Sequence, residues 1–108
     1  MIVFVAACIH LDQVHLTELP EAVEGCEDCL LSGEPWLHLR ICLACGHVGC
    51  CDDSPNRHAR AHAHSSDHQI IRSIEPGETW SWCFQDQLAL DIPAVHGETR
   101  IPPSPLGG

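Results

Sequence analysis

The sequence predicts one small domain in which several short strands accompany a single helix, and its core needs reinforcement. A chain of 108 residues is the length of one domain and buries only about two-thirds of its unfolded surface. Short β-branched runs alternate with turn residues, and one stretch alone carries helix start signals. Eight cysteines and nine histidines outnumber five aromatic residues. Cysteine and histidine are therefore the candidates for the reinforcement.

The chain opens with an apolar run, Met1–Ile9, that has two interpretations. Val5-Ala6-Ala7-Cys8 resembles a bacterial lipoprotein cleavage box, but no Lys or Arg precedes it, and the four or five apolar residues at the start are too few for the usual hydrophobic region of 7–15 residues. We therefore predict a first strand over Ile2–Val5, with a lipoprotein as the alternative. No stretch approaches the roughly 18 apolar residues of a membrane span, so we expect a soluble cytoplasmic protein without a membrane partner.

The next segments lead to a second strand. Pro20–Asp28 is acidic and turn-like, and Cys29–Gly33 is expected to be a loop or short turn. Trp36–Ile41 then alternates apolar and polar residues with a period of two, which predicts a half-buried strand. Cys42 directly follows this predicted strand.

The helix is predicted in the middle of the chain. Ser54 is the expected N-cap and Pro55 the first helical residue, and Asn56–Ser65 contains neither Gly nor Pro. A strand over Gln69–Ile74 follows, closed by a turn over Glu75–Glu78. Further strands are expected over Thr79–Phe84 and Gln87–Leu90. The domain is thus predicted to span residues 1–90, with residues 91–108 forming a Pro- and Gly-rich tail that is extended or disordered.

The charge balance excludes nucleic acid as a partner. Five arginines and no lysine oppose 15 carboxylates, for a formal net charge of −10. Nucleic-acid-binding modules need clustered Lys and Arg to displace counterions from phosphates. The acidic surface is most simply a solubility feature.

Two Cys-x-x-Cys pairs, Cys26/Cys29 and Cys42/Cys45, are separated by twelve residues. A tight turn lets both sulfurs of such a pair bind one Zn²⁺ at about 2.3 Å, and in a reducing compartment these thiols are ligands rather than disulfides. Cys50, His58, His62 and His68 raise the donor count to eight, enough for two closed sites. His64 falls on another helix face. Cys8, His10, Cys83 and Asp86 offer a third set, so we expect three zinc ions.

These residues resemble the UBP-type zinc finger, the ubiquitin-tail-binding module of some deubiquitinases, and short stand-alone bacterial members look most similar. The resemblance rests on the spacing of Cys8-x-His10, the two Cys-x-x-Cys pairs, Gly46-His-Val-Gly-Cys50, the helical histidines and Trp82-Cys83-Phe84-x-Asp86, and it covers about Cys8–Leu88. It implies a small α+β domain with a twisted, mostly antiparallel sheet packed on the central helix. It also implies three ligand sets: Cys26, Cys29, Cys50 and His58; Cys42, Cys45, His62 and His68; and Cys8, His10, Cys83 and Asp86.

The resemblance further implies a pocket for a free peptide C-terminus. Trp82 matches one aromatic wall, and Phe84 stands where the family often has tyrosine. Asp52 occupies the place of the family's arginine and would repel a carboxylate, whereas Arg40 could bind one from another side. We therefore expect ubiquitin binding to be weakened or lost, with recognition of some peptide or protein C-terminus retained.

The sequence also bears on other classes of function. No His-Glu-x-x-His or deaminase motif is present, so an enzyme is not expected. A purely structural zinc domain and a redox-sensing thiol protein are the alternatives. Cys51 is expected to be an unligated thiol. The terminal Leu106-Gly107-Gly108 resembles a ubiquitin-like tail and could occupy the pocket of its own or a neighbouring molecule.

Overall fold

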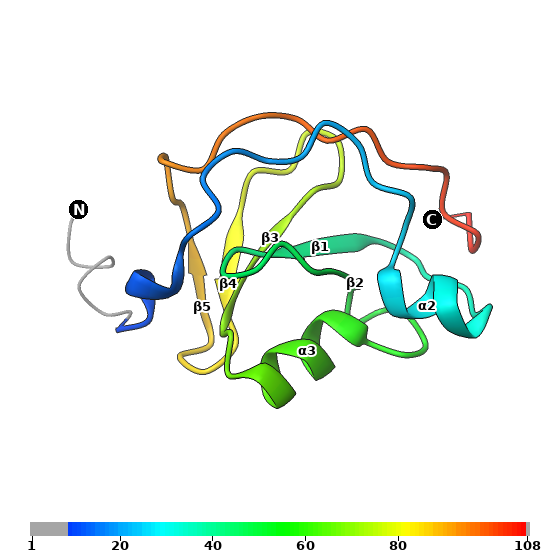
Figure 1. Ribbon diagram of the computed structural model, residues 1–108, viewed down its shortest axis with the longest axis horizontal. Coiled ribbons are helices and arrows are strands. Elements are labelled where there is room, and N and C mark those ends of the chain that lie inside the picture. Colours follow the sequence, from blue (N-terminus) through cyan, green and yellow to red (C-terminus); the bar gives the residue numbers. More distant parts are fainter. Residues whose placement is uncertain (1–8, 108) are drawn as a thin grey trace.

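The computed structural model describes residues 9–107, so the predicted strand Ile2–Val5 and the predicted ligand Cys8 lie outside the described residues. Five strands form one antiparallel sheet in the order β2-β1-β3-β4-β5 (Figure 1). The strands are β1 Leu39–Cys42, β2 Val48–Cys50, β3 Ile70–Ser73, β4 Ser81–Cys83 and β5 Leu88–Leu90. The helical elements are the 3-10 turn η1 Leu11–Gln13 and the α-helices α2 Glu27–Ser32 and α3 His58–Ser66. The predicted α+β class is confirmed.

The strand β1 lies inside the sheet and sets its register. Arg40 is opposite Gly49 of β2 on one side and Ser73 of β3 on the other. The period-two pattern that predicted this strand reflects real burial, because Leu39 and Ile41 are 0% and 1% exposed. Both side chains point to the face that carries the hydrophobic core.

The central helix begins later than predicted. The helix α3 starts at His58, and its N-cap is Arg57, which adopts a left-handed conformation with φ 50°. Ser54 is not the N-cap, because its buried hydroxyl instead accepts a hydrogen bond from the Leu37 N–H at 2.8 Å. This bond fixes the Ser54–Arg57 turn to the entrance of β1, and the helix starts three positions later than predicted.

The 3-10 turn η1, the helix α2 and the strand β2 were not predicted from the sequence. Cys29–Gly33 was expected to be a loop or turn, but Glu27–Ser32 forms the helix α2, which ends on Gly33 with φ 77°. Cys26 is its N-cap and makes no side-chain capping bond, so the usual start signal is missing. The strand β2 was also missed, because it lies within the Gly-rich stretch next to the second cysteine pair.

The face of the sheet that carries the core is covered by two irregular segments that run side by side. Residues 14–24 and 91–101 cross above the sheet in Figure 1. They are joined by parallel bridges, Glu18 with His96 and Ala22 with Arg100. Leu19 and Val95 from these segments pack into the same cluster as the buried residues of β1 and β3.

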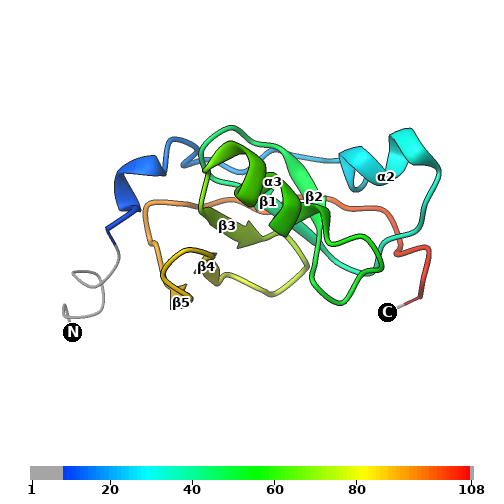
Figure 2. The same ribbon diagram turned by 90° about the horizontal axis from the view of Figure 1, so that it is seen from below.

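The helix α3 packs closely on the edge strand β2. Figure 2 shows α3 in front of the sheet when the molecule is seen from below. Gly49 makes this approach possible, since a Cβ at that position would lie 2.6 Å from the Ala59 nitrogen and 2.8 Å from its Cα. The close contact brings the strand that carries Cys50 next to the helix that carries His58.

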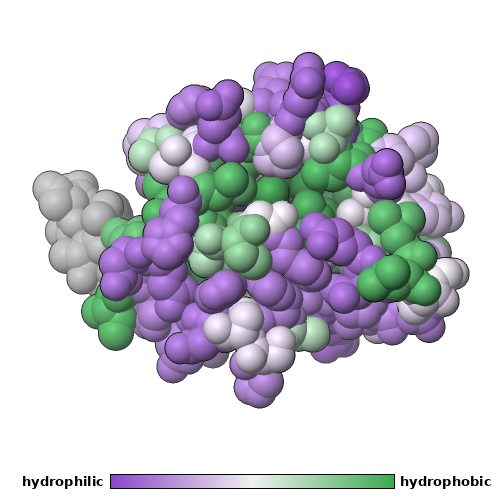
Figure 3. Space-filling model, in the orientation of Figure 1, coloured by the Kyte–Doolittle hydropathy of each residue, from purple (hydrophilic) through white to green (hydrophobic). Residues whose placement is uncertain are grey.

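The surface is mostly polar, with one exposed apolar group on α2. Figure 3 shows apolar side chains gathered at the position of this helix, where Leu31 is 88% exposed and Leu30 49%. No helix within residues 9–107 has the length and apolar character needed to cross a membrane.

Candidate functional site

The first candidate metal centre joins α2, β2 and α3. Cys26 and Cys29 come from the start of α2, Cys50 from the end of β2, and His58 from the first residue of α3. Their four donor atoms lie within 4.8 Å of one another, and the three sulfurs are buried. The ligand set implied by the family resemblance is therefore brought together in space.

The distances in this cluster fit tetrahedral zinc. Ligands at about 2.3 Å for sulfur and 2.0–2.1 Å for nitrogen would place two sulfurs roughly 3.8 Å apart and a sulfur and a nitrogen roughly 3.6 Å apart. The Cys29 and Cys50 sulfurs are 3.9 Å apart. The His58 Nδ1 lies 3.3 Å from the sulfurs of Cys26 and Cys29 and 3.6 Å from that of Cys50. A Zn²⁺ ion can be accommodated without rearranging the chain.

Hydrogen bonds favour a thiolate at Cys50. The Cys26 thiol bonds to the Cys50 sulfur, which lowers the pKa of Cys50 to about 5 and raises the pKa of Cys26. The backbone N–H of His58 also donates to Cys50 at 3.2 Å. A bound divalent ion would hold all three cysteines as thiolates.

The second candidate centre contains Cys42, Cys45, His62 and His68, whose donor atoms also lie within 4.8 Å of one another. Cys42 is buried and Cys45 exposed. The Cys45 sulfur is 3.3 Å from His62 Nε2, and the Cys42 sulfur is 3.7 Å from His68 Nδ1. These separations also fit zinc.

His47 supports the second centre from outside the ligand set. Its ring stacks on His62 with centroids 4.3 Å apart and planes at 11°, while its Nε2 lies 3.0 Å from an Asp28 carboxylate oxygen. Burial lowers the pKa of His62, which favours the neutral imidazole that a metal requires. Asp28 belongs to α2, so this contact links the second centre to the helix of the first.

The third candidate centre joins the two ends of the domain. His10, Cys83 and Asp86 place their donor atoms together, whereas Cys8 lies outside the described residues. His10 Nδ1 is 2.9 Å from Asp86 Oδ2, a hydrogen-bond distance, and both are 3.5 Å from the Cys83 sulfur. Cys83 and Asp86 lie at the two ends of a turn. The backbone N–H of Asp86 donates a hydrogen bond to the Cys83 sulfur at 3.4 Å and closes this turn.

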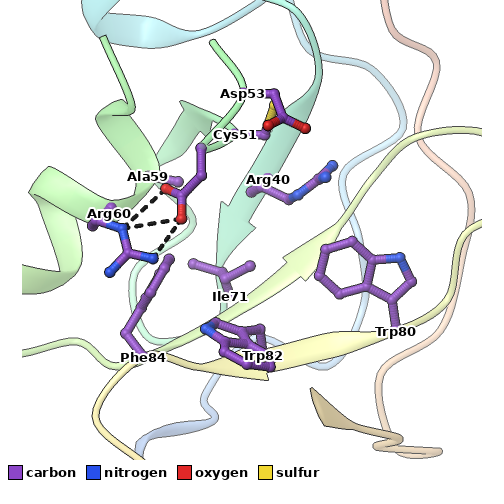
Figure 4. Close-up of a pocket in the computed structure, with 10 residues that line it drawn as sticks. Arg40, Cys51, Asp53, Ala59, Arg60, Ile71, Trp80, Trp82 and Phe84 are labelled. Carbon is purple, nitrogen blue, oxygen red and sulfur yellow. Dashed lines mark hydrogen bonds and ion pairs between the residues drawn. The ribbon is translucent and has the colours of Figure 1, made fainter. Parts of the chain in front are cut away.

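A pocket of about 230 Å³ lies between α3 and the face of the sheet opposite the core. Figure 4 shows Trp80, Trp82 and Phe84 in a row along one side of this pocket. Alternate residues of a strand point to the same face, so β4 and its flanking residues present all three rings together. Arg40, Asp52, Trp82 and Phe84, the predicted peptide-binding residues, all line the pocket.

Asp52 does not face the pocket as an isolated negative charge. Arg60 of α3 donates to both Asp52 carboxylate oxygens, with Nε 3.1 and 3.0 Å away (Figure 4). The same guanidinium lies over the Phe84 ring, 5.0 Å from its centroid. The ion pair raises the pKa of Arg60, so the pair stays charged and the repulsion expected from Asp52 is offset.

Arg40 is the cation on the other side of the pocket. Its guanidinium carbon lies 4.6 Å above the Trp80 ring centroid, and Nη1 donates to the Leu39 carbonyl at 3.0 Å and to the Ser73 hydroxyl at 3.2 Å. Within residues 9–107, Nε and Nη2 have no acceptor, which leaves donors for a ligand.

Sequence reasoning missed Arg60 and Trp80 as pocket residues. The spacing Trp80-x-Trp82-x-Phe84 was a usable signal, because period two on one strand places all three on one face. Arg60 gave no such signal, since its pairing with Asp52 depends on how α3 is placed against the loop after β2.

Comparisons with known proteins agree with this geometry. A family described as a Zn-finger in ubiquitin-hydrolases and other proteins matches residues 26–93. A Rhodopseudomonas palustris protein solved in solution by NMR is 43% identical, with a TM-score of 0.67, over 84% of this chain and 91% of that one. A sequence search of curated proteins gave no match. With its Cys/His clusters and this family match, the chain belongs to the zinc fingers found in ubiquitin-hydrolases and other proteins.

Proposed function

We propose that the chain is a non-catalytic module that binds three zinc ions and recognises the free C-terminus of a peptide or protein. The observation that carries this proposal is the pocket between α3 and the sheet, which is lined by three aromatic rings and by the Arg40 guanidinium, stacked on Trp80 and with unused donors. Such a combination suits a carboxylate at the end of a small apolar segment. The zinc ions hold the loops that shape this pocket.

The pocket size restricts what can enter. A volume of about 230 Å³ is below the about 300–1,000 Å³ of sites for drug-sized molecules. We expect it to hold the last one or two residues of a chain, with small side chains. Among the described residues no cation stacks on Trp82, unlike Trp80 and Phe84, so its face is available to the ligand's backbone.

Arg40 is the proposed carboxylate ligand. It occupies the opposite side of the pocket from the Asp52–Arg60 pair, so a bound carboxylate would accept hydrogen bonds from Arg40 and lie apart from the Asp52 charge. This differs from the arrangement implied by the family resemblance, in which position 52 supplies the arginine. Ubiquitin is therefore a doubtful partner.

The proposed location is the cytoplasm. Six of the seven cysteines within residues 9–107 lie in donor clusters with histidine or aspartate. Zinc–thiolate sites of this kind are stable where disulfides do not form.

A peptide screen tests the proposal. Peptides ending in small residues are titrated into the metal-loaded protein in pairs, one with a free C-terminal carboxylate and one with a C-terminal amide, with tryptophan fluorescence as the readout. We expect carboxylate peptides to bind at least tenfold more tightly, because the charge-assisted bonds to Arg40 are lost in the amide.

Two variants make the test specific. Arg40→Gln should abolish the difference between carboxylate and amide peptides, whereas Arg100→Gln, an exposed arginine outside the pocket, should leave it unchanged. Equal binding of both peptide forms, or no binding of any peptide, would contradict C-terminus recognition and leave a structural zinc domain as the function.

A further inference from the structure

A second cavity, of about 370 Å³, lies at the opposite end of the sheet from α3. It is bounded by the turn between β3 and β4 and by residues 97–101, which lie close to each other at the top of Figure 1. The pocket between α3 and the sheet shares no lining residue with it. Neither the three metal-ligand clusters nor the proposed C-terminus pocket includes residues that line this cavity.

The cavity contains a buried arginine with few partners. Arg72 of β3 is 6% exposed and lines the cavity. Within residues 9–107, its guanidinium makes one hydrogen bond, from Nη1 to the Ser73 carbonyl at 3.1 Å, and no ion pair. The described residues therefore leave four of its five N–H donors unused.

A neighbouring polar group is also left unsatisfied. Ser81 of β4 is the cross-strand partner of Arg72, and paired residues point to the same face of a sheet. The Ser81 Oγ is buried and has no hydrogen-bond partner among the described residues. A polar ligand in the cavity would remove the energetic cost of the unused Arg72 donors, whereas Ser81 does not line the cavity.

The surrounding charges decide what kind of ligand fits. Arg100 also lines the cavity and is exposed at its mouth. Of the three lining glutamates, Glu75 accepts from the Leu39 N–H at 2.9 Å and Glu78 from the Ser73 hydroxyl at 2.6 Å, whereas Glu98 is exposed. Asp91 acts on Arg72 only at longer range. Among the lining residues, Arg72 is the one buried charge, whereas the three glutamates are half-buried or exposed.

From this geometry we infer that the second cavity binds a small oxyanion, a carboxylate or a phosphate, through the Arg72 guanidinium with Arg100 at the entrance. The planar fork of an arginine matches two oxygens of either group. Burial lowers the pKa of Arg72, as expected for a charge without a close counter-ion, and a bound anion would supply one. This site is independent of the proposed C-terminus pocket.

The test is a titration of the metal-loaded protein followed by ¹H–¹⁵N NMR. Acetate, succinate and phosphate are the probes, with sodium chloride at equal ionic strength as the reference. We expect saturable shifts in the Glu75–Thr79 turn, in residues 97–101 and at the Arg72 side-chain Nε–H. Tighter binding of succinate than of phosphate would identify a carboxylate as the ligand. Tighter binding of phosphate would identify a phosphate group.

Variants separate this site from the other pocket. Arg72→Lys keeps the buried charge but loses the fork, so binding should weaken at least tenfold. Because this variant could fail to fold, Arg100→Gln is the second variant, with an expected loss of several-fold at an exposed position. Arg57→Gln, at an exposed arginine that lines neither cavity, should leave anion binding unchanged. Shifts no larger than those with chloride, or shifts that persist in both variants, would overturn the inference.

Discussion

The close packing of α3 on β2 gives a quantitative prediction at Gly49. A Cβ added there would lie 2.6 Å from the Ala59 backbone nitrogen, whereas ordinary contact begins at 3.4 Å. The helix and strand must therefore separate by about 0.8 Å. Since the obstacle is backbone, no side chain can rotate to relieve it.

This separation would distort the first metal centre. Cys50 follows Gly49 on β2 and His58 precedes Ala59 on α3, so the two ligands move apart with their elements. Metal–ligand distances tolerate deviations of about 0.2 Å, which is a quarter of the required shift. Overpacking of this kind costs about 1–3 kcal/mol, and each kcal/mol lowers the melting temperature by about 4–8 °C in a domain of this size.

Cobalt spectroscopy is the assay, because the absorption of Co²⁺ bound at a zinc site reports its coordination geometry. We expect Gly49→Ala to lower the melting temperature and to alter the tetrahedral cobalt spectrum. The matched control is Gly77→Ala, where φ is +80° and nothing lies within 4 Å. Backbone strain of about 1–2 kcal/mol should destabilise the control without changing its spectrum. A Gly49→Ala protein with an unchanged spectrum and melting temperature would refute the reasoning.

Three further predictions follow from other contacts. Asp52→Ala should change stability by no more than about 1 kcal/mol, because the Asp52–Arg60 pair is exposed. The same variant should tighten the binding of carboxylate peptides in a fluorescence titration. Weaker binding would count against the assignment of Asp52 as a repulsive charge in the pocket. Ser54→Ala should cost about 1–3 kcal/mol in chemical denaturation, since it leaves the Leu37 N–H unsatisfied, whereas Ser65→Ala, at an exposed position, should be nearly neutral. Acidification should destabilise the protein below about pH 6.5: burial lowers the pKa of His62, so the unfolded chain binds the proton more readily and stability is lost as pH falls. A melting temperature that stays constant from pH 7 to pH 5 would contradict that assignment.

The clustering of the candidate metal ligands could be anticipated from sequence because zinc chemistry demands particular residue types at particular spacings. A tight turn brings Cys26 and Cys29 together, and a helix places His58 and His62 on one side because they are four residues apart. Both arrangements are local and follow from the spacing alone. The crossed pairing, in which Cys50 joins the first cysteine pair, depends on the antiparallel placement of β2 beside β1. Spacing alone does not contain that information, and the family resemblance supplied it.

The elements that sequence reasoning missed are those that tertiary contacts stabilise. The helix α2 has six residues, too few to be stable alone, and it is held by Cys29 in the first metal centre and by Glu27, which accepts from the Val48 N–H at 2.9 Å. Residues 91–101 lack any periodic pattern because they pair with another irregular segment through isolated bridges. Their role in covering the core is therefore visible only in the folded chain.

The central claim is that metal held by the three donor clusters stabilises this fold. Native mass spectrometry of the protein purified with its metal tests the claim most directly. The account predicts a mass equal to the polypeptide plus three zinc ions, with all the clustered cysteines bound as thiolates. A folded protein that carries two ions or fewer, or whose mass shows disulfides in place of metal, would contradict it.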